Sequence, residues 1–141
     1  MSETETRTRF DEPLYQRRSR GCTFLTEGEA NLLRRRSKAR HKSVSRTIQE
    51  LVQPVIDRFE NSSTEVREIM LQGYTEQNVK NMETGLKTFE ESRSPAFVLI
   101  YWVLPKTFTD RLGDMAAKGR LSNESLMSSI LMQAIHMGDN N

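Results

Sequence analysis

The basic side chains of this sequence are concentrated in one stretch. Between Arg20 and Arg46, eight lysines and arginines stand against only two acidic residues. Residues 1–58 carry a net charge of +5, residues 59–96 carry −3, and residues 97–141 carry none. A local concentration of ammonium and guanidinium groups is typical of surfaces that bind phosphates. A solvated helix face rich in arginine has the same composition, so the charge alone leaves both interpretations open.

Side chains for catalysis or metal binding are scarce. The two histidines, His41 and His136, have no cysteine, aspartate or glutamate at a metal-ligand spacing. The glycines form no phosphate-binding loop. The acidic pair Glu90 and Glu91 lies in a polar stretch typical of a solvated helix end. We therefore expect no catalytic residue, no metal site and no cofactor, and we expect that the chain is not an enzyme.

Length and composition predict one small domain without a membrane-spanning helix. The chain has 141 residues, of which 35% are hydrophobic and 28% are charged, so its core must be small. Its longest apolar run, residues 96–104, is far shorter than the roughly 20 residues of a membrane-spanning helix. The N-terminus is acidic and polar, unlike a secretory signal, and Cys22 is the single cysteine. These features predict a cytoplasmic protein.

One small pattern occurs twice, and a single constant offset relates the two occurrences. Each copy has the pattern of a short strand, a helix, a tight turn and a second helix. The matched pairs are Leu25 and Leu104, Leu33 and Leu112, Ser43 and Ser122, Ile48 and Met127, and Leu51 and Ile130. Matches at one offset without a gap indicate two copies of the same structural unit. Their apolar members are expected in the core.

The two copies set the predicted organisation of the chain. In the first, a strand that ends at Leu25 precedes a helix capped by Thr26 and a helix capped by Ser43. In the second, a strand over residues 97–104 precedes a helix and then a helix capped by Ser122. The predicted regions are a flexible N-terminal arm (1–17), a first unit (18–58), a helical insert (59–95) and a second unit (96–138).

The insert is predicted to hold two helices. Pro54 is expected to end or kink the helix before it. Residues 62–65 have the form of a capping box, which predicts a helix that stops near Gly73, and Thr75 is expected to cap another. These amphipathic helices either pack on the core or offer a surface for self-association or for a partner protein.

The strand that ends in leucine, the helix, and the serine that opens a second helix resemble the ribbon-helix-helix family of DNA-binding proteins, which includes Arc, MetJ and CopG. Residues 104–127 are the closer match, and residues 25–48 match as well. The resemblance implies a mainly α fold with a short two-stranded antiparallel ribbon. Because one chain supplies both units, it implies a tandem ribbon-helix-helix pseudo-dimer with a helical insert.

The resemblance also implies how double-stranded DNA would be bound. In this family the ribbon enters the major groove, and the amides that open each second helix bind flanking phosphates. Strand alternation predicts the side chains that face the bases: Arg18, Arg20, Cys22, Phe24, Tyr101 and Val103. The residues predicted to contact phosphates are Arg34, Arg35, Arg36, Lys38, Arg40, Lys42, Ser43, Val44, Arg46, Ser122 and Asn123. Four of these residues open the second helices, and for them simple capping is an equally good interpretation: Ser43, Val44, Ser122 and Asn123.

The outward ribbon positions depart from the family pattern, in which they are usually polar or basic. Here only Arg18 and Arg20 offer paired hydrogen bonds to guanine, whereas Phe24, Tyr101 and Val103 would contact thymine methyl groups. An apolar outer face could equally be covered by another part of the protein or by a partner protein.

Two units in one chain resemble the tandem ribbon-helix-helix proteins of conjugative DNA transfer, of the TraY type. The resemblance implies an accessory factor of plasmid or mobile-element transfer, a relaxosome component. Its partners would be double-stranded DNA, a relaxase or another protein bound through the insert, and further copies of itself on DNA. A transcriptional repressor or autoregulator is the alternative role. An alternative of another class is a protein-interaction module with the same fold.

Overall fold

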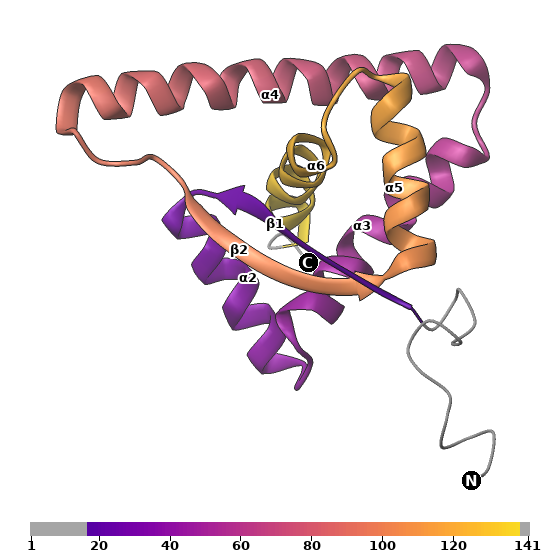
Figure 1. Ribbon diagram of the computed structural model, residues 1–141, viewed down its shortest axis with the longest axis horizontal. Coiled ribbons are helices and arrows are strands. Elements are labelled where there is room, and N and C mark those ends of the chain that lie inside the picture. The colour runs from indigo at the N-terminus through magenta and orange to yellow at the C-terminus, as the bar shows by residue number, and fades with distance from the viewer. Residues whose placement is uncertain (1–16, 139–141) are drawn as a thin grey trace, which may run out of the picture.

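The computed structural model describes residues 17–138 and is shown in Figure 1. In chain order the elements are β1 (Arg18–Leu25), α2 (Glu27–Ala39), α3 (Val44–Glu60), α4 (Thr64–Ser92), β2 (Val98–Pro105), α5 (Lys106–Lys118) and α6 (Asn123–Gly138). The predicted mainly helical fold with a two-stranded antiparallel sheet is confirmed for the described residues. None of the described helices is both long and apolar enough to cross a membrane. The predicted N-terminal arm lies outside the described residues apart from Arg17.

The register of the β1–β2 ribbon is symmetric with respect to the two copies. The strands pair antiparallel from Arg18 opposite Pro105 to Leu25 opposite Val98. In this register Cys22 lies opposite Tyr101, which is also its equivalent in the second copy. Two equivalent antiparallel strands related by a twofold axis have one position at which a residue meets its own equivalent. The register therefore fits a twofold relation between the copies, centred on Cys22 and Tyr101.

The inward face of the ribbon forms one wall of the core. The buried strand side chains are Thr23, Leu25, Ile100, Trp102 and Leu104. Gly21 lies opposite Trp102 across the ribbon, and a Cβ atom on Gly21 would lie 2.4 Å from the indole ring. A side chain at this position would therefore displace the tryptophan.

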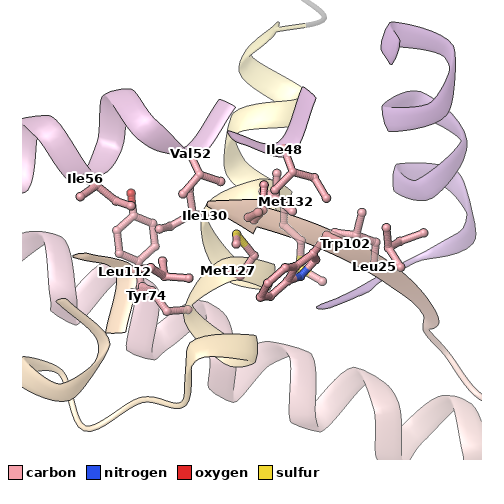
Figure 2. Close-up of a cluster of buried hydrophobic side chains, with 14 of the residues drawn as sticks. Leu25, Ile48, Val52, Ile56, Tyr74, Trp102, Leu112, Met127, Ile130 and Met132 are labelled. Carbon is pink, nitrogen blue, oxygen red and sulfur yellow. The ribbon is translucent and has the colours of Figure 1, made fainter. Parts of the chain in front are cut away.

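The four helices of the two copies interlock over this face. The second helix of each copy packs on the strand of the other, because α6 contacts β1 and α3 contacts β2. Figure 2 shows Leu25 and Ile48 of the first copy in the same buried cluster as Trp102 and Met127 of the second. Each copy thus contributes to the core of the other.

Local features of the two copies also match. Ser43 accepts a hydrogen bond from the Arg46 amide at 3.0 Å, and Ser122 accepts one from the Ser125 amide at 3.1 Å. The predicted caps are thus confirmed, and Thr26 caps α2 in a capping box with Glu29. The turn before each second helix holds one residue with a φ of 55°, His41 in the first copy and its equivalent Arg120 in the second.

The insert is one helix, so the prediction of two helices was wrong. Helix α4 runs for 29 residues through Gly73 and Thr75. A helical glycine costs roughly 1 kcal/mol relative to alanine, but the next residue, Tyr74, is buried in the core, and this packing keeps the helix continuous. The N-cap is Ser63, which accepts from the Val66 amide at 3.3 Å, one position after the predicted start of the capping box.

The sequence predicted that Pro54 would either end or kink its helix. Helix α3 does not end there. It continues to Glu60, two residues past the predicted end of the first unit. The residues after the proline include Ile56 and Phe59, both buried in the core. Their burial favours continuation of the helix against the cost of the proline.

Candidate nucleic-acid interface

The outward face of the ribbon carries the predicted base-contacting residues. Arg18 and Arg20 are exposed, and Cys22 and Phe24 are half-buried. Tyr101, at the centre of the ribbon, is 74% exposed, and Val103 is exposed as well. The predicted alternation of inward and outward side chains is therefore confirmed for both strands.

The two halves of this face differ in charge. At the offset that relates the two copies, Arg20 corresponds to Leu99, and Phe24 corresponds to Val103. Two guanidinium groups, Arg18 and Arg20, thus lie on the first strand, and the second strand has no charged side chain. Within residues 17–138 neither guanidinium forms an ion pair, so both are available to a ligand.

The N-terminus of α3 lies against the edge of β2. The Val103 amide donates a hydrogen bond to the Ser45 hydroxyl at 2.9 Å. A hollow at this contact is lined by residues of three elements: Arg18, Ser43, Ser45, Arg46, Gln49, Val103, Leu104 and Pro105. The first turn of α3 has no acidic residue, so the positive end of the helix dipole is not neutralised there. This hollow, called the first clamp below, brings predicted base contacts and predicted phosphate contacts together.

Glu50 restrains two of the predicted phosphate contacts. Its Oε1 atom lies 2.5 Å from Lys42 Nζ and 3.5 Å from Arg46 Nε. The hydrogen bond from Lys42 is the main reason why the pKa of Glu50 is lowered. A phosphate at the first clamp would therefore share Arg46 with Glu50. Sequence reasoning missed this carboxylate, although the spacing of four residues between Arg46 and Glu50 was a visible signal.

The arginines of α2 are not gathered at the ribbon. Arg36 lines a separate hollow with Leu51 and Pro54 of α3 and with Met137 of α6. The other predicted phosphate contacts on α2 and at its C-cap are exposed and lie outside the first clamp: Arg34, Arg35, Lys38 and Arg40.

The N-terminus of α6 forms a second, different clamp. Ser122 caps this helix, and Asn123 lies against α5, where a Cβ atom on Gly113 would be 3.5 Å from its side chain. The position equivalent to Ser45 is Glu124, which lines a hollow at the centre of the ribbon with Arg20, Cys22 and Tyr101, and Ser45 itself lines this hollow as well. A carboxylate therefore lies beside the ribbon where the first clamp has a hydroxyl. Sequence reasoning did not weigh its charge.

A charged cluster away from the ribbon joins the two copies. Arg111 of α5 donates to Asp57 at 2.5 Å and to Glu60 at 2.6 Å, both in the C-terminal part of α3. The hydrogen bond from Arg111 is the main cause of the lowered pKa of Glu60, and the pKa of Arg111 is raised in turn. Among residues 17–138, no group of three or more histidine, cysteine, aspartate or glutamate residues could hold a metal ion.

Comparisons with known proteins identify no relative. No protein-family model, no curated protein and no solved structure matches this chain. A function must therefore be argued from the chain's own residues, and above all from the ribbon and its two unequal clamps.

Proposed function

We propose that this protein binds double-stranded DNA through the outward face of the β1–β2 ribbon, as a tandem ribbon-helix-helix pseudo-dimer. The first clamp carries the proposal, because it joins Arg18 of the ribbon to Ser43 and Arg46 at a helix N-terminus. A helix N-terminus with a guanidinium group holds a phosphate, and an adjacent exposed strand can reach base edges in the major groove. The symmetric register and the interlocked helices support the pseudo-dimer.

The asymmetry of the interface predicts an asymmetric binding site. Arg20 would form paired hydrogen bonds with a guanine in one half of the site. The equivalent position in the other half is Leu99, which together with Phe24, directly opposite it in the ribbon, favours thymine methyl groups. The Glu124 carboxylate, at the start of α6 beside Thr23 of β1, repels phosphates there. The preferred duplex is therefore not a palindrome.

The role we favour is that of an accessory factor of plasmid or mobile-element DNA transfer in the cytoplasm, because both units are fused in one chain. Helix α4 would then be the surface for a relaxase or another protein. A transcriptional repressor or autoregulator is the alternative role. A protein-interaction module is the alternative of another class, and the exposure of Tyr101 and Leu99, at 74% and 54%, favours it.

Binding of duplex fragments by the full chain tests the proposal. Random fragments retained by the purified protein are sequenced, and affinity is measured over a range of salt concentrations. Replacing Arg18 and Arg46 by alanine should weaken binding to all duplexes and lower the slope of log K against log salt by about 1 to 2, because Arg46 is the predicted phosphate contact and Arg18 adds a second positive charge to the same clamp. The matched control is Lys106→Ala with Lys118→Ala, which removes the same charge from α5 and should change the slope less.

The outcomes separate the classes of function. If the wild-type protein retains no duplex at low salt, DNA binding is wrong, and the protein-interaction module takes its place. If both double variants lower the slope equally, the first clamp is not the phosphate site.

A further inference from the structure

A hollow of about 530 Å³ lies where α3 and α6, the second helices of the two copies, pack against each other. Equivalent residues of the two copies line it in pairs: Leu51 with Ile130, Val55 with Ala134, and Arg58 with Met137. A hollow lined by both members of matched pairs lies on the twofold axis that relates the copies. Its lining comes from α2, α3, α4 and α6 and includes no residue of the ribbon. We call it the α3–α6 hollow.

The floor of the α3–α6 hollow is apolar. Ile130 of α6 and Tyr74 of α4 are buried, at 1% and 6% exposure, and Figure 2 shows the tyrosine ring beside the isoleucine. Leu51, Val55 and Ala134 are half-buried. Ala134 lies where the first copy has Val55, and its smaller side chain leaves space between the two helices.

Two guanidinium groups border this floor, and both belong to the first copy. They are those of Arg36 on α2 and Arg58 on α3, whereas the equivalent positions in the second copy are Met115 and Met137. Within residues 17–138 neither arginine forms an ion pair. Burial raises the pKa of Tyr74, and Arg58 acts on it in the opposite direction. The arginines therefore add positive charge to an apolar site without an ionic partner.

The carboxylate of Glu50 also lines the α3–α6 hollow, but its charge is balanced from the side of the first clamp. Its Oε1 atom lies 2.5 Å from Lys42 Nζ and 3.5 Å from Arg46 Nε. Neither of these two cations lines the hollow. The hollow thus keeps an excess of positive charge beside its apolar floor.

We propose that the α3–α6 hollow binds a small organic anion with a compact apolar body. Its volume lies in the range of roughly 300–1,000 Å³ that is typical of small-molecule sites, which are mostly apolar with a few polar groups. The apolar body covers Leu51, Val55 and Ile130, and the arginines donate charge-assisted hydrogen bonds to the anionic head group. A neutral or cationic molecule of the same shape would leave the guanidinium groups without a matching charge.

The site belongs to both copies at once. A ligand there contacts α3 of the first copy and α6 of the second, so its binding free energy adds to the stability of the folded chain. The inference does not depend on DNA binding, because no part of the ribbon lines the site.

Anilinonaphthalene sulfonate is a suitable probe, because it carries one sulfonate on an apolar ring system and its fluorescence rises in apolar surroundings. Titration of the full chain should show saturable binding. Phenylnaphthylamine, which has the same rings without the sulfonate, should bind roughly tenfold or more weakly, because it forms no charge-assisted hydrogen bond. Methyl NMR should place the probe through shifts at Leu51, Val55 and Ala134.

Two kinds of variant test the charge and the space separately. Arg36→Met with Arg58→Met, the residue type found at both positions of the second copy, should weaken binding of the sulfonate by roughly tenfold or more. The matched control is Arg34→Met with Arg35→Met, which removes the same charge from exposed positions of α2 outside the hollow and should leave the affinity unchanged. Ala134→Leu fills the hollow and should weaken binding without a change of charge. Circular dichroism verifies that the variants keep their helices.

Three results would overturn the proposal. Equal affinity for the sulfonate and its uncharged analogue would show that the site does not select an anion. Equal affinity of the two double arginine variants would show that Arg36 and Arg58 do not hold the head group. Methyl shifts confined to Met82 and Leu86, which line a separate apolar hollow with Phe24 and Phe97, would place the probe there instead.

Discussion

The two strand-helix-helix units share their buried positions but not their surfaces. Leu33 and its equivalent Leu112 are both fully buried, and Ile48 and Met127 are as well. On the surface, the first unit has eight basic residues between Arg20 and Arg46, whereas residues 97–141 have no net charge. Because each unit closes the core of the other, a change at a buried position affects both. Surface positions carry no such restriction, so one unit can specialise in ligand contact while the other mainly completes the fold.

The two clamps likewise share their backbone arrangement and differ in charge. Both second helices begin at a capping serine beside the edge of a strand. The Val103 amide donates to Ser45 of α3, and the Phe24 amide donates to Ser128 of α6 at 3.0 Å. The first clamp adds Arg46, and the second adds Glu124. The same backbone scaffold therefore supports opposite electrostatics.

The largest expected effect comes from deleting the second unit. Deleting residues 97–141 removes β2, α5 and α6, and with them the surfaces on which β1 and α3 pack. Residues 1–58 should then fail to fold as a monomer. A well-dispersed amide NMR spectrum from the monomeric truncated chain would show that the first unit is independent.

A smaller effect is expected where the two copies differ inside the core. Gly21→Ala would place a Cβ atom 2.4 Å from the Trp102 ring, and such overpacking typically costs about 1–3 kcal/mol of unfolding free energy. The equivalent position in the second copy is Ile100, so only the first copy lacks a side chain at this position. Gly28→Ala is the matched control, because nothing lies within 4 Å of its added methyl group. Equal urea midpoints for the two variants would contradict the close fit.

Reversing one charge should make the second clamp more like the first. Glu124→Lys should raise affinity for random-sequence duplex several-fold and make the salt dependence steeper by roughly one to two phosphate contacts. The control Glu76→Lys makes the same charge change on α4, away from the ribbon. If both variants bind equally well, net charge rather than the second clamp controls affinity.

The smallest effect concerns the ion pairs that Glu50 and Glu60 of α3 form with Lys42 and Arg111. In the folded protein, hydrogen bonds from Lys42 and Arg111 hold the pKa values of Glu50 and Glu60, respectively, below the ordinary value of a glutamate. Their contribution to stability is therefore present above that value and is lost as the pH falls through the lowered pKa values. Urea unfolding from neutral to acidic pH should show this loss, and Arg111→Ala should reduce it. Because Glu50 is only half-buried and Glu60 is exposed, solvent screens both carboxylates, and the change should be smaller than that of Gly21→Ala. A pH dependence that Arg111→Ala leaves unaltered would assign the loss to other groups.

The sequence alone predicted much of the fold because the signals were local. Thr26, Ser43 and Ser122 cap helices through hydrogen bonds to amides only three residues away, which a sequence pattern can show. The alternation of the strands placed Tyr101 outward and Trp102 inward for the same reason. The constant offset between matched positions predicted two copies of one unit, and the symmetric register of the ribbon is consistent with it.

Tertiary structure decided the features in which distant residues meet. Burial of Tyr74 carries α4 through Gly73, where the sequence predicted a stop, and burial of Phe59 carries α3 through Pro54, where the sequence predicted an end or a kink. The close fit of Gly21 to Trp102 and the position of Glu124 beside the ribbon join residues that lie far apart in the sequence, and no local pattern contains them. Local propensities amount to a few kcal/mol at most, and core packing outweighs them wherever the two disagree.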